Sequence, residues 1–329
     1  MQGAIETVGL KKVYPAPRIP GRRGPKPAQP SPGVLALDGL DLRVEPGEFF
    51  GMLGPNGAGK TTSIGILTTR VRATAGQARV DGVEVHAQPV EVRRRIGVVP
   101  QRPNPDRALN VVENLLFHAA YFGIPRSAAL KRAEGLMERL GFADKALAKV
   151  DALSGGQQQR LMIARALIHE PRVVFLDEPT VGLDPAARQE LWALLRELHA
   201  QGRTIVMTTH YMEEADQLCD RIAIIDRGRL LALDTPAGLR AQAPGGTMVE
   251  LALDGDAAEV VESAQALDGV ERAEARGHAL RAFTPRGGEL IPALIAAAEA
   301  KGRAVKDIAL ARPSLETLFI SLTGRKLDA

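Results

Sequence analysis

The chain has 329 residues, of which 45% are hydrophobic and 25% charged, and 42 lysines and arginines against 39 acidic residues leave a formal net charge of +3. At about 150 residues per domain this length predicts roughly two domains, and it excludes a mainly disordered chain. Cys219 is the only cysteine, which excludes an intramolecular disulfide scaffold, and no uncharged apolar run reaches the roughly 18–20 residues of a membrane span. Because the start, MQGAIETVGLKK, also lacks the apolar stretch of a signal peptide, we expect a soluble, cytosolic protein.

The segment 15–33 is rich in proline and basic residues, and it reads PAPRIPGRRGPKPAQPSPG. Such a composition buries too little apolar surface to order itself, so we expect an inserted surface loop or linker. The alternative is that its cations contact anionic lipid head groups or a membrane partner. These cations are Arg18, Arg22, Arg23 and Lys26.

From there to about residue 245, short apolar runs alternate with longer segments of helical spacing. The apolar runs are Phe49–Leu53, Ile96–Val99, Val173–Leu176, Thr204–Thr208 and Arg221–Ile225. Helical spacing is clearest over Gln157–Ile168 and Ala186–His199. Strands that alternate with helices predict an α/β domain, residues 1–245, whose mostly parallel sheet is covered by helices on both faces. Residues 104–165 contain no good strand pattern, and we expect them to form a helical subdomain.

The pattern changes after Ala-Pro-Gly-Gly at 243–246. The expected order is then strand, helix, hairpin, helix, strand and helix, over Met248–Leu253, Ala257–Leu267, Glu271–Thr284, Gly288–Gly302, Ala304–Ala311 and Ser314–Leu322. This order predicts a small accessory α+β domain, residues 246–329, with helices on one face of a sheet.

The first motif with chemical meaning matches the pattern G-x-x-x-x-G-K-[ST] in full and reads Gly54-Pro55-Asn56-Gly57-Ala58-Gly59-Lys60-Thr61. It lies between an apolar run and a helix-compatible segment, as a phosphate-binding loop requires. We expect the loop and Thr62 to bind phosphates through backbone N–H groups, Lys60 to neutralise the β- and γ-phosphates, and Thr61 to ligate Mg²⁺. The alternative, a glycine-rich turn with an incidental lysine, does not explain the complete motif in this context.

The second motif is the apolar run from Val173 that ends in two carboxylates, Asp177 and Glu178. In P-loop enzymes, an aspartate at such a strand end holds the Mg²⁺ shell. A second carboxylate beside it can deprotonate an attacking water, which makes Glu178 the general-base candidate. In isolation the pair would be read as a solvated turn, but a phosphate-binding loop in the same domain favours the catalytic interpretation.

The third motif places Ser154-Gly155-Gly156-Gln157 at the start of an amphipathic helix. Ser154 is a good N-cap, and the two glycines leave backbone N–H groups uncovered. The helix start is therefore a second candidate anion-binding terminus, about a hundred residues after the first. A merely capped helix is the alternative.

LSGGQ at 153–157, together with the phosphate-binding loop and VVFLDEP at 173–179, resembles the ATP-binding subunits of ABC transporters. The resemblance covers nearly the whole chain, and other P-loop classes such as small GTPases and nucleotide kinases lack LSGGQ. It implies an ATPase that binds ATP with Mg²⁺ and forms an ATP-dependent homodimer, in which Ser154 and Gly156 of one copy reach the ATP of the other.

The resemblance also implies roles for four further residues. Gln101 corresponds to the glutamine that contacts Mg²⁺ and water and senses the membrane partner, and His210 corresponds to the histidine that hydrogen-bonds the γ-phosphate. Asp184 lies in the loop that crosses the dimer interface. Tyr14 takes the place of the aromatic residue that stacks on adenine, although the 15–33 segment after it departs from the family pattern, and displacement of Tyr14 is the alternative.

Three further stretches resemble type-2 ABC exporters, especially the daunorubicin-resistance and nodulation-factor export ATPases: THYMEEAD at 209–216, RGRL at 227–230 and PSLETLFISLTGR at 313–325. This implies a subunit on the cytoplasmic face of the membrane that docks a separate permease around Gln101 and drives export of a drug-like, lipid or saccharide substrate. The alternatives are an importer subunit, or a non-transport ABC ATPase that acts on nucleic acid or the ribosome. The small net charge and the single cassette disfavour a nucleic-acid partner.

Overall fold

The computed structural model describes residues 3–15, 33–243, 246–285, 287–311 and 313–325. The chain divides into two compact units, one up to Thr235 and one over Pro236–Leu327. The sequence places the boundary at 245/246, whereas in the structure helix α8 (Pro236–Ala241) belongs to the second unit, where it contacts α11 (Leu315–Thr323). Within the described ranges, no helix combines the length and the apolar character that crossing a membrane requires.

The first unit is built on a six-stranded sheet with the order β10-β9-β3-β8-β7-β6. The neighbours from β9 to β6 run parallel, and β10 pairs antiparallel with β9. The strand bounds confirm the five predicted apolar runs: β3 Phe49–Leu53, β6 Ile96–Val99, β7 Val173–Asp177, β8 Thr204–Thr209 and β9 Arg221–Asp226. The sixth strand, β10 Arg229–Asp234, was not predicted. Strands β3, β7 and β8 are buried at every position, as expected for parallel strands covered on both faces.

A second, antiparallel sheet of order β2-β1-β4-β5 was not predicted. Its strands are β1 Ile5–Tyr14, β2 Val34–Val44, β4 Ala75–Val80 and β5 Val83–Glu84. Helix α1 (Lys60–Leu67) contacts β2 and β4 of this sheet and β7 of the parallel sheet. The helix and the two sheets share one apolar core. Of the predicted 15–33 insertion, residues 16–32 lie outside the described residues, and the strands on either side pair through Tyr14 and Val34.

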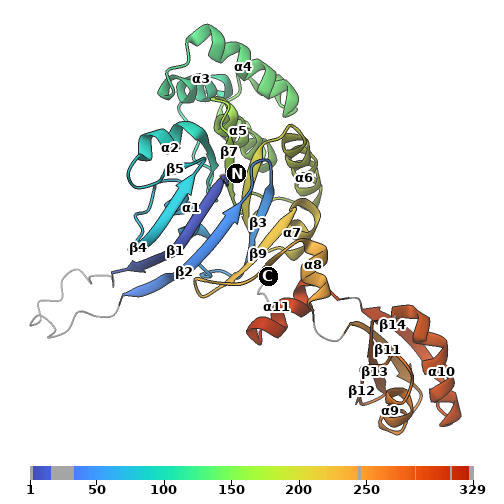
Figure 1. The fold of residues 1–329 in the computed structure, drawn as a ribbon. Coiled ribbons are helices and arrows are strands. Elements are labelled where there is room, and N and C mark those ends of the chain that lie inside the picture. The colour runs from blue at the N-terminus through green and yellow to red at the C-terminus, as the bar shows by residue number, and fades with distance from the viewer. Residues whose placement is uncertain (1–2, 16–32, 244–245, 286, 312, 326–329) are drawn as a thin grey trace, which may run out of the picture. The chain divides into compact units, whose positions relative to one another are not determined.

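The helical subdomain consists of α3 (Val111–Tyr121), α4 (Arg126–Arg139) and the first part of α5 (Gly155–Leu167), joined by short 3-10 turns at Ala143–Lys145 and Val150–Ala152. The three helices contact one another, and α5 also contacts β6 and α6 (Pro185–Ala200), which links the subdomain to the sheet (Figure 1). The remaining helices of this unit are α2 (Pro89–Arg95) and α7 (Met212–Leu218).

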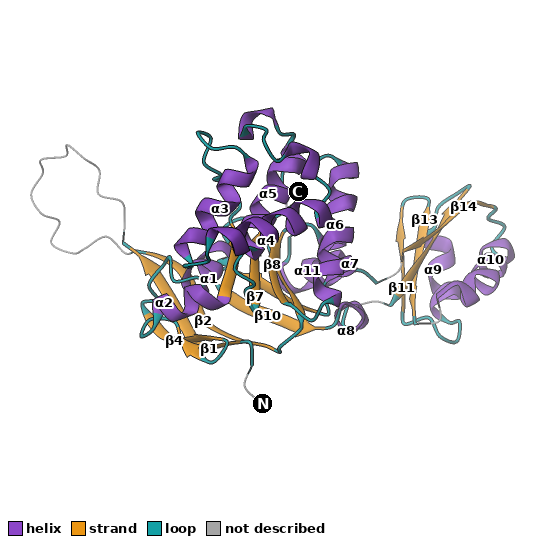
Figure 2. Ribbon diagram, turned by 90° about the horizontal axis from the view of Figure 1, so that it is seen from above, coloured by secondary structure: helices purple, strands orange, loops and turns teal. Residues whose placement is uncertain are grey.

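The second unit contains a four-stranded antiparallel sheet of order β12-β13-β11-β14. Its elements follow the predicted order: β11 Thr247–Leu253, α9 Ala258–Gln265, β12 Arg272–Arg276, β13 Ala279–Thr284, a 3-10 turn at Gly287–Leu290, α10 Ile291–Ala300, β14 Val305–Ala311 and α11. Helices α9 and α10 contact each other and pack on the same face of the sheet, where their apolar residues form one core with β11 and β13 (Figure 2).

Candidate nucleotide-binding and catalytic site

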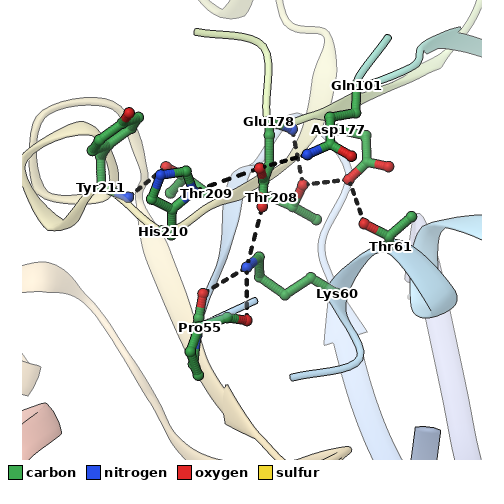
Figure 3. Close-up of polar contacts among 11 residues, drawn as sticks. Pro55, Lys60, Thr61, Gln101, Asp177, Glu178, Thr208, Thr209, His210 and Tyr211 are labelled. Atoms are coloured by element: carbon green, nitrogen blue, oxygen red, sulfur yellow. Dashed lines mark hydrogen bonds and ion pairs between the residues drawn. The ribbon is translucent and has the colours of Figure 1, made fainter. Parts of the chain in front are cut away.

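The carboxyl ends of four neighbouring strands bring the predicted site residues of the first unit together. Strand β3 leads into the phosphate-binding loop, β7 ends at Asp177, β8 ends just before His210, and β6 ends just before Gln101. Because these strands are parallel, their carboxyl ends meet at one edge of the sheet, where open α/β sheets bind ligands. Figure 3 shows the resulting cluster of side chains.

The phosphate-binding loop depends on glycine at two positions. Gly57 and Gly59 have φ angles of 81° and 107°, a left-handed region that other residues rarely adopt. A Cβ on Gly59 would also lie 2.7 Å from the Ala36 carbonyl oxygen, so the backbone can follow this path only without a side chain. Gly59 caps α1, and the loop therefore turns directly into a helix N-terminus, where N–H groups favour an anion.

Lys60 is buried at the centre of the site. Its Nζ donates to the carbonyl oxygens of Gly54 (2.5 Å) and Pro55 (3.1 Å) and lies 3.3 Å from Glu178 Oε1. Burial lowers the pKa of the Lys60 ammonium, while the charges of Glu178 and Asp177 oppose this shift. All three polar contacts of the Lys60 ammonium are thus with oxygen atoms, and phosphate oxygens can take their place.

Asp177 is fixed by two hydroxyl groups. Thr61 Oγ1 donates to Asp177 Oδ1 at 3.2 Å, and Thr208 Oγ1 donates to the same oxygen at 2.7 Å. Thr61 and Asp177 present a hydroxyl and a carboxylate, which are ligands that Mg²⁺ takes together with phosphate oxygens, so the donor set fits this ion. The sequence analysis assigns no role to Thr208, which is one of three threonines in β8 and carries no signal of its own.

Glu178 follows Asp177 in a left-handed backbone conformation, with φ of 49°. Its N–H donates to the backbone oxygen (3.1 Å) and to the hydroxyl (3.0 Å) of Thr208, which hold the turn in place. The 6% exposed Glu178 accepts a hydrogen bond from Gln101 Nε2 (2.9 Å) at Oε2, and His210 Nδ1 lies 3.5 Å from the same oxygen. Lys60, Gln101 and His210 thus surround this carboxylate (Figure 3).

The loop lines a cavity of about 400 Å³ on the surface of the first unit. Tyr14 also lines it, with its hydroxyl 3.5 Å from Thr62 Oγ1 and its ring 4.8 Å from Lys12 Nζ, so Tyr14 remains beside the loop despite the insertion that follows it. The remaining lining residues are Val34, Leu35, Ala36, Pro55, Asn56, Gly57, Ala58, Gly59, Lys60, Thr61, Thr62, Gln101 and Glu178.

The predicted residues at the start of α5 lie in a different cavity, of about 300 Å³. Ser154 is the N-cap of α5: its hydroxyl accepts from Gln157 N (3.2 Å), and its own N–H donates to Gln157 Oε1 (3.0 Å). Asp184 caps α6 by accepting from Ala187 N (2.9 Å), and it lines the same cavity as residues 154–157. Of the residues that the structure describes, none lines both cavities.

A strand, phosphate-binding loop and helix, beside a strand end that carries Asp177 and Glu178, define a P-loop nucleoside triphosphatase. The helical subdomain, with LSGGQ at the start of α5, narrows the class to the ATP-binding cassettes. Comparison with known proteins agrees, because the ABC transporter family model matches residues 37–181.

Two curated relatives resemble the chain over most of its length. It is 42% identical over 303 residues to the daunorubicin resistance ATP-binding protein DrrA2 of Streptomyces coeruleorubidus. The alignment covers 89% of this chain and 92% of that protein. The chain is 40% identical over 325 residues to the Nod factor export ATP-binding protein I of Rhizobium sp. (strain N33), covering 99% and 98%. The chain belongs to the ABC transporter family, as an ATP-binding subunit with ATPase activity.

Solved structures show the same cassette. The chain superimposes on cbiO1 from Clostridium perfringens, part of the ABC transporter complex cbiONQ, with a TM-score of 0.64 and 27% identity over 74% of this chain and 92% of that one. A dimeric post-hydrolysis state of the ATP-binding cassette MJ0796, bound to ADP and Pi, gives a TM-score of 0.61 and 26% identity over 70% and 98%.

Proposed function

We propose that two copies of the chain bind two ATP molecules between them and that hydrolysis of this ATP drives a separate membrane permease. The observation that carries the proposal is the separation of the two cavities: the phosphate-binding loop lines one and residues 154–157 line the other. Both segments have the backbone N–H groups that bind phosphate, and a two-fold axis lets each copy supply the start of α5 to the other copy's nucleotide.

Each nucleotide is bound mainly by the phosphate-binding loop, residues 54–61, and by Thr62. Lys60 exchanges its carbonyl and carboxylate partners for the β- and γ-phosphates, while Tyr14 stacks on the adenine at the open end of the cavity. Thr61, Asp177 and Gln101 would hold Mg²⁺, which when bound neutralises charge on the phosphates. From the partner copy, residues 154–157 face the γ-phosphate and Asp184 lies beside the attacking water.

For hydrolysis, Glu178 takes the proton of the attacking water. The carboxylate is positioned by the Gln101 hydrogen bond at 2.9 Å and by the Lys60 ion pair at 3.3 Å, so its oxygens have fixed directions. His210, whose Nδ1 lies 3.5 Å from Glu178 Oε2, hydrogen-bonds the γ-phosphate beside the attacking water. Lys60 and His210 stabilise the negative charge that develops as the terminal phosphate separates.

The permease docks on the groove that follows Gln101, which places the chain on the cytoplasmic face of the membrane. Asn104, Phe117 and Tyr121 line a cavity of about 340 Å³ there. Phe117 and Tyr121 are 53% and 75% exposed and pack edge to face, with ring centroids 5.1 Å apart, so their aromatic surface is open to a partner. The likeness to DrrA2 and to the Nod factor export subunit favours export of a drug-like, lipid or saccharide substrate.

A complementation assay tests whether the ATP site is shared between copies. Lys60→Ala removes the phosphate ligand, and Ser154→Glu places a carboxylate against the γ-phosphate while remaining compatible with a helix N-terminus. Each variant alone has two defective sites and is expected to be inactive. A mixed dimer contains one intact site, so an equal mixture recovers about a quarter of the parental ATPase rate.

The control for this assay is a mixture of the parental chain with Lys60→Ala. It shows whether a dimer with one intact site turns over, because active mixed dimers raise the rate above that of the parental dimers alone. If these mixed dimers are active and the two defective variants still fail to complement each other, the shared site is wrong.

A further inference from the structure

Glu214 is a buried carboxylate that the proposed hydrolysis does not use. It lies on α7, four residues after His210, and its side chain is 0% exposed. Its Oε1 accepts a hydrogen bond from the indole Nε1 of Trp192 on α6 at 3.2 Å. A buried polar group costs free energy unless it is hydrogen-bonded, so a carboxylate in this position needs a reason beyond packing.

The surroundings of Glu214 come from both sides of the catalytic turn. The hydroxyl of Thr180, two residues after Glu178, and that of Thr209, one residue before His210, are near enough to affect its ionisation, as is the charge of Arg188 on α6. Thr180 is also 0% exposed, and its carbonyl accepts from Leu183 N (3.1 Å), which folds the loop 180–184 back on itself.

Two polar atoms at this point are unsatisfied among the residues that the structure describes: Glu214 Oε2 and Thr180 Oγ1 are both buried and neither makes a hydrogen bond. Burial raises the pKa of the Glu214 carboxyl, and the contacts with Thr209, Thr180 and Trp192 offset this only in part. The Thr180 hydroxyl can donate a hydrogen bond to Glu214 Oε2 when the carboxylate is ionised, and it can accept one from the carboxyl when Glu214 is protonated. One hydrogen bond then satisfies both atoms.

A second chain of contacts runs from α6 to the catalytic carboxylate. The guanidinium of Arg188 lies 4.6 Å from the ring centroid of Tyr211, and the Tyr211 ring lies 4.1 Å from that of His210. Tyr211 N donates to Thr209 Oγ1 (2.9 Å), and His210 Nδ1 lies 3.5 Å from Glu178 Oε2.

We propose that Glu214 is a positioning residue that joins the loop 180–184 to the segment 209–211, so that the placement of His210 beside Glu178 depends on the position of that loop. This inference rests on the proposed function, in which Asp184 of the same loop lies against the partner copy. Contact with the partner is then transmitted through Thr180 and Glu214 to His210 and the γ-phosphate of the chain's own site. Glu214 thereby makes hydrolysis at one site sensitive to assembly at the other.

The test compares the ATPase kinetics of the full chain with those of three variants. Glu214→Gln keeps an acceptor for Trp192 and a donor for Thr180, and it is expected to retain at least about half of kcat. Glu214→Met removes all hydrogen bonding at similar volume, and it is expected to lower kcat about tenfold or more while KM for ATP stays within about twofold. Glu213→Met changes the exposed neighbouring glutamate in the same way and is the matched control, expected to leave kcat unchanged.

A fourth variant separates the proposed role of Glu214 from a folding defect of Glu214→Met. Thr180→Val removes the hydroxyl that faces Glu214 at nearly constant volume, and it is expected to lower kcat severalfold without changing KM, with no further loss when combined with Glu214→Met. In the Glu178→Gln background, Glu214→Met should still allow ATP-dependent dimer formation, which a general structural defect would not.

Two results would overturn the inference: a folded Glu214→Met or Thr180→Val protein whose kcat stays within twofold of the parental value, or one in which KM changes instead of kcat. Failure of Lys60→Ala and Ser154→Glu to complement each other, while mixed dimers of the parental chain and Lys60→Ala are active, would contradict the proposed function instead. The two failures are therefore distinguishable.

Discussion

Replacement of Glu178 by glutamine tests the catalytic arrangement most sharply, because it changes one charge and almost no volume. The side chain is 6% exposed and is contacted by Gln101 at 2.9 Å and Lys60 at 3.3 Å. Glutamine still offers an oxygen to Gln101, but it cannot accept the proton of water. Loss of a general base costs about 10²–10⁴ in rate, or about 3–5 kcal/mol in the activation free energy at roughly 1.4 kcal/mol per tenfold.

The affinity for ATP, unlike the rate of hydrolysis, should not decrease in Glu178→Gln. Glu178 is a carboxylate partner of the buried Lys60, and this partnership is lost when the ammonium turns to phosphate. Glu178→Gln removes that competitor, so the dissociation constant for ATP should stay equal or decrease. We would measure phosphate release at saturating ATP and Mg²⁺, and ATP binding by equilibrium dialysis. A variant that hydrolyses ATP at the parental rate, or that loses ATP binding, would refute the assignment of Glu178 as the base.

Three further predictions follow from particular contacts. Thr208→Val removes a 2.7 Å hydrogen bond to the buried Asp177. This loss is expected to lower the free energy of unfolding by about 1.5–3 kcal/mol and to raise the Mg²⁺ concentration for half-maximal ATPase activity. Urea unfolding and Mg²⁺ titration measure these two quantities, and unchanged values would contradict the prediction. Tyr121→Ser is expected to leave the basal ATPase activity of the isolated chain unchanged and to weaken the stimulation of this activity by the permease. The stimulation is measured after reconstitution with the permease, and full stimulation would show that Tyr121 is not part of the docking site. Burial, with the charges of Arg165 and His169, lowers the pKa of His118 to about 4. Below pH 6.5 the unfolded chain therefore takes up a proton that the folded chain does not, and acid destabilises the fold. The His118→Gln protein should lose less free energy of unfolding between pH 7 and pH 4 than the parental chain, and an equal loss would be inconsistent with this effect.

Local patterns were sufficient for the elements that carry their own signal. The buried strands β3, β7 and β8 are mainly apolar runs. The phosphate-binding loop needs glycine at Gly57 and Gly59 because both have a positive φ angle, and the motif shows these glycines in the sequence itself. Ser154 and Gln157 form a capping box, which is likewise a matter of spacing within one helix. For this reason the phosphate-binding loop and Ser154 could be named from local patterns, whereas Tyr14, Gln101, Asp184 and His210 were expected only from the resemblance to ABC transporter subunits.

Contacts between distant segments could not be predicted in this way. Thr208 acts on Asp177 across 31 positions, and its identity as a threonine in a strand carries no information about its partner. The antiparallel sheet depends on the pairing of β1 with β2 and β4, which periodicity does not specify. Glu214 sits in a helix whose exposed Glu213 has the same chemistry, so only burial distinguishes the two.

The central claim is that one ATP site is built from two copies of the chain, and the mass of the Glu178→Gln protein in solution tests it most directly. By light scattering with size exclusion, we expect a mass of 35.1 kDa without nucleotide and about twice that value with ATP and Mg²⁺. Adding Ser154→Glu should abolish the shift while each chain still binds ATP. A mass that stays at 35.1 kDa when ATP is demonstrably bound, or a dimer that Ser154→Glu leaves intact, would contradict the shared site.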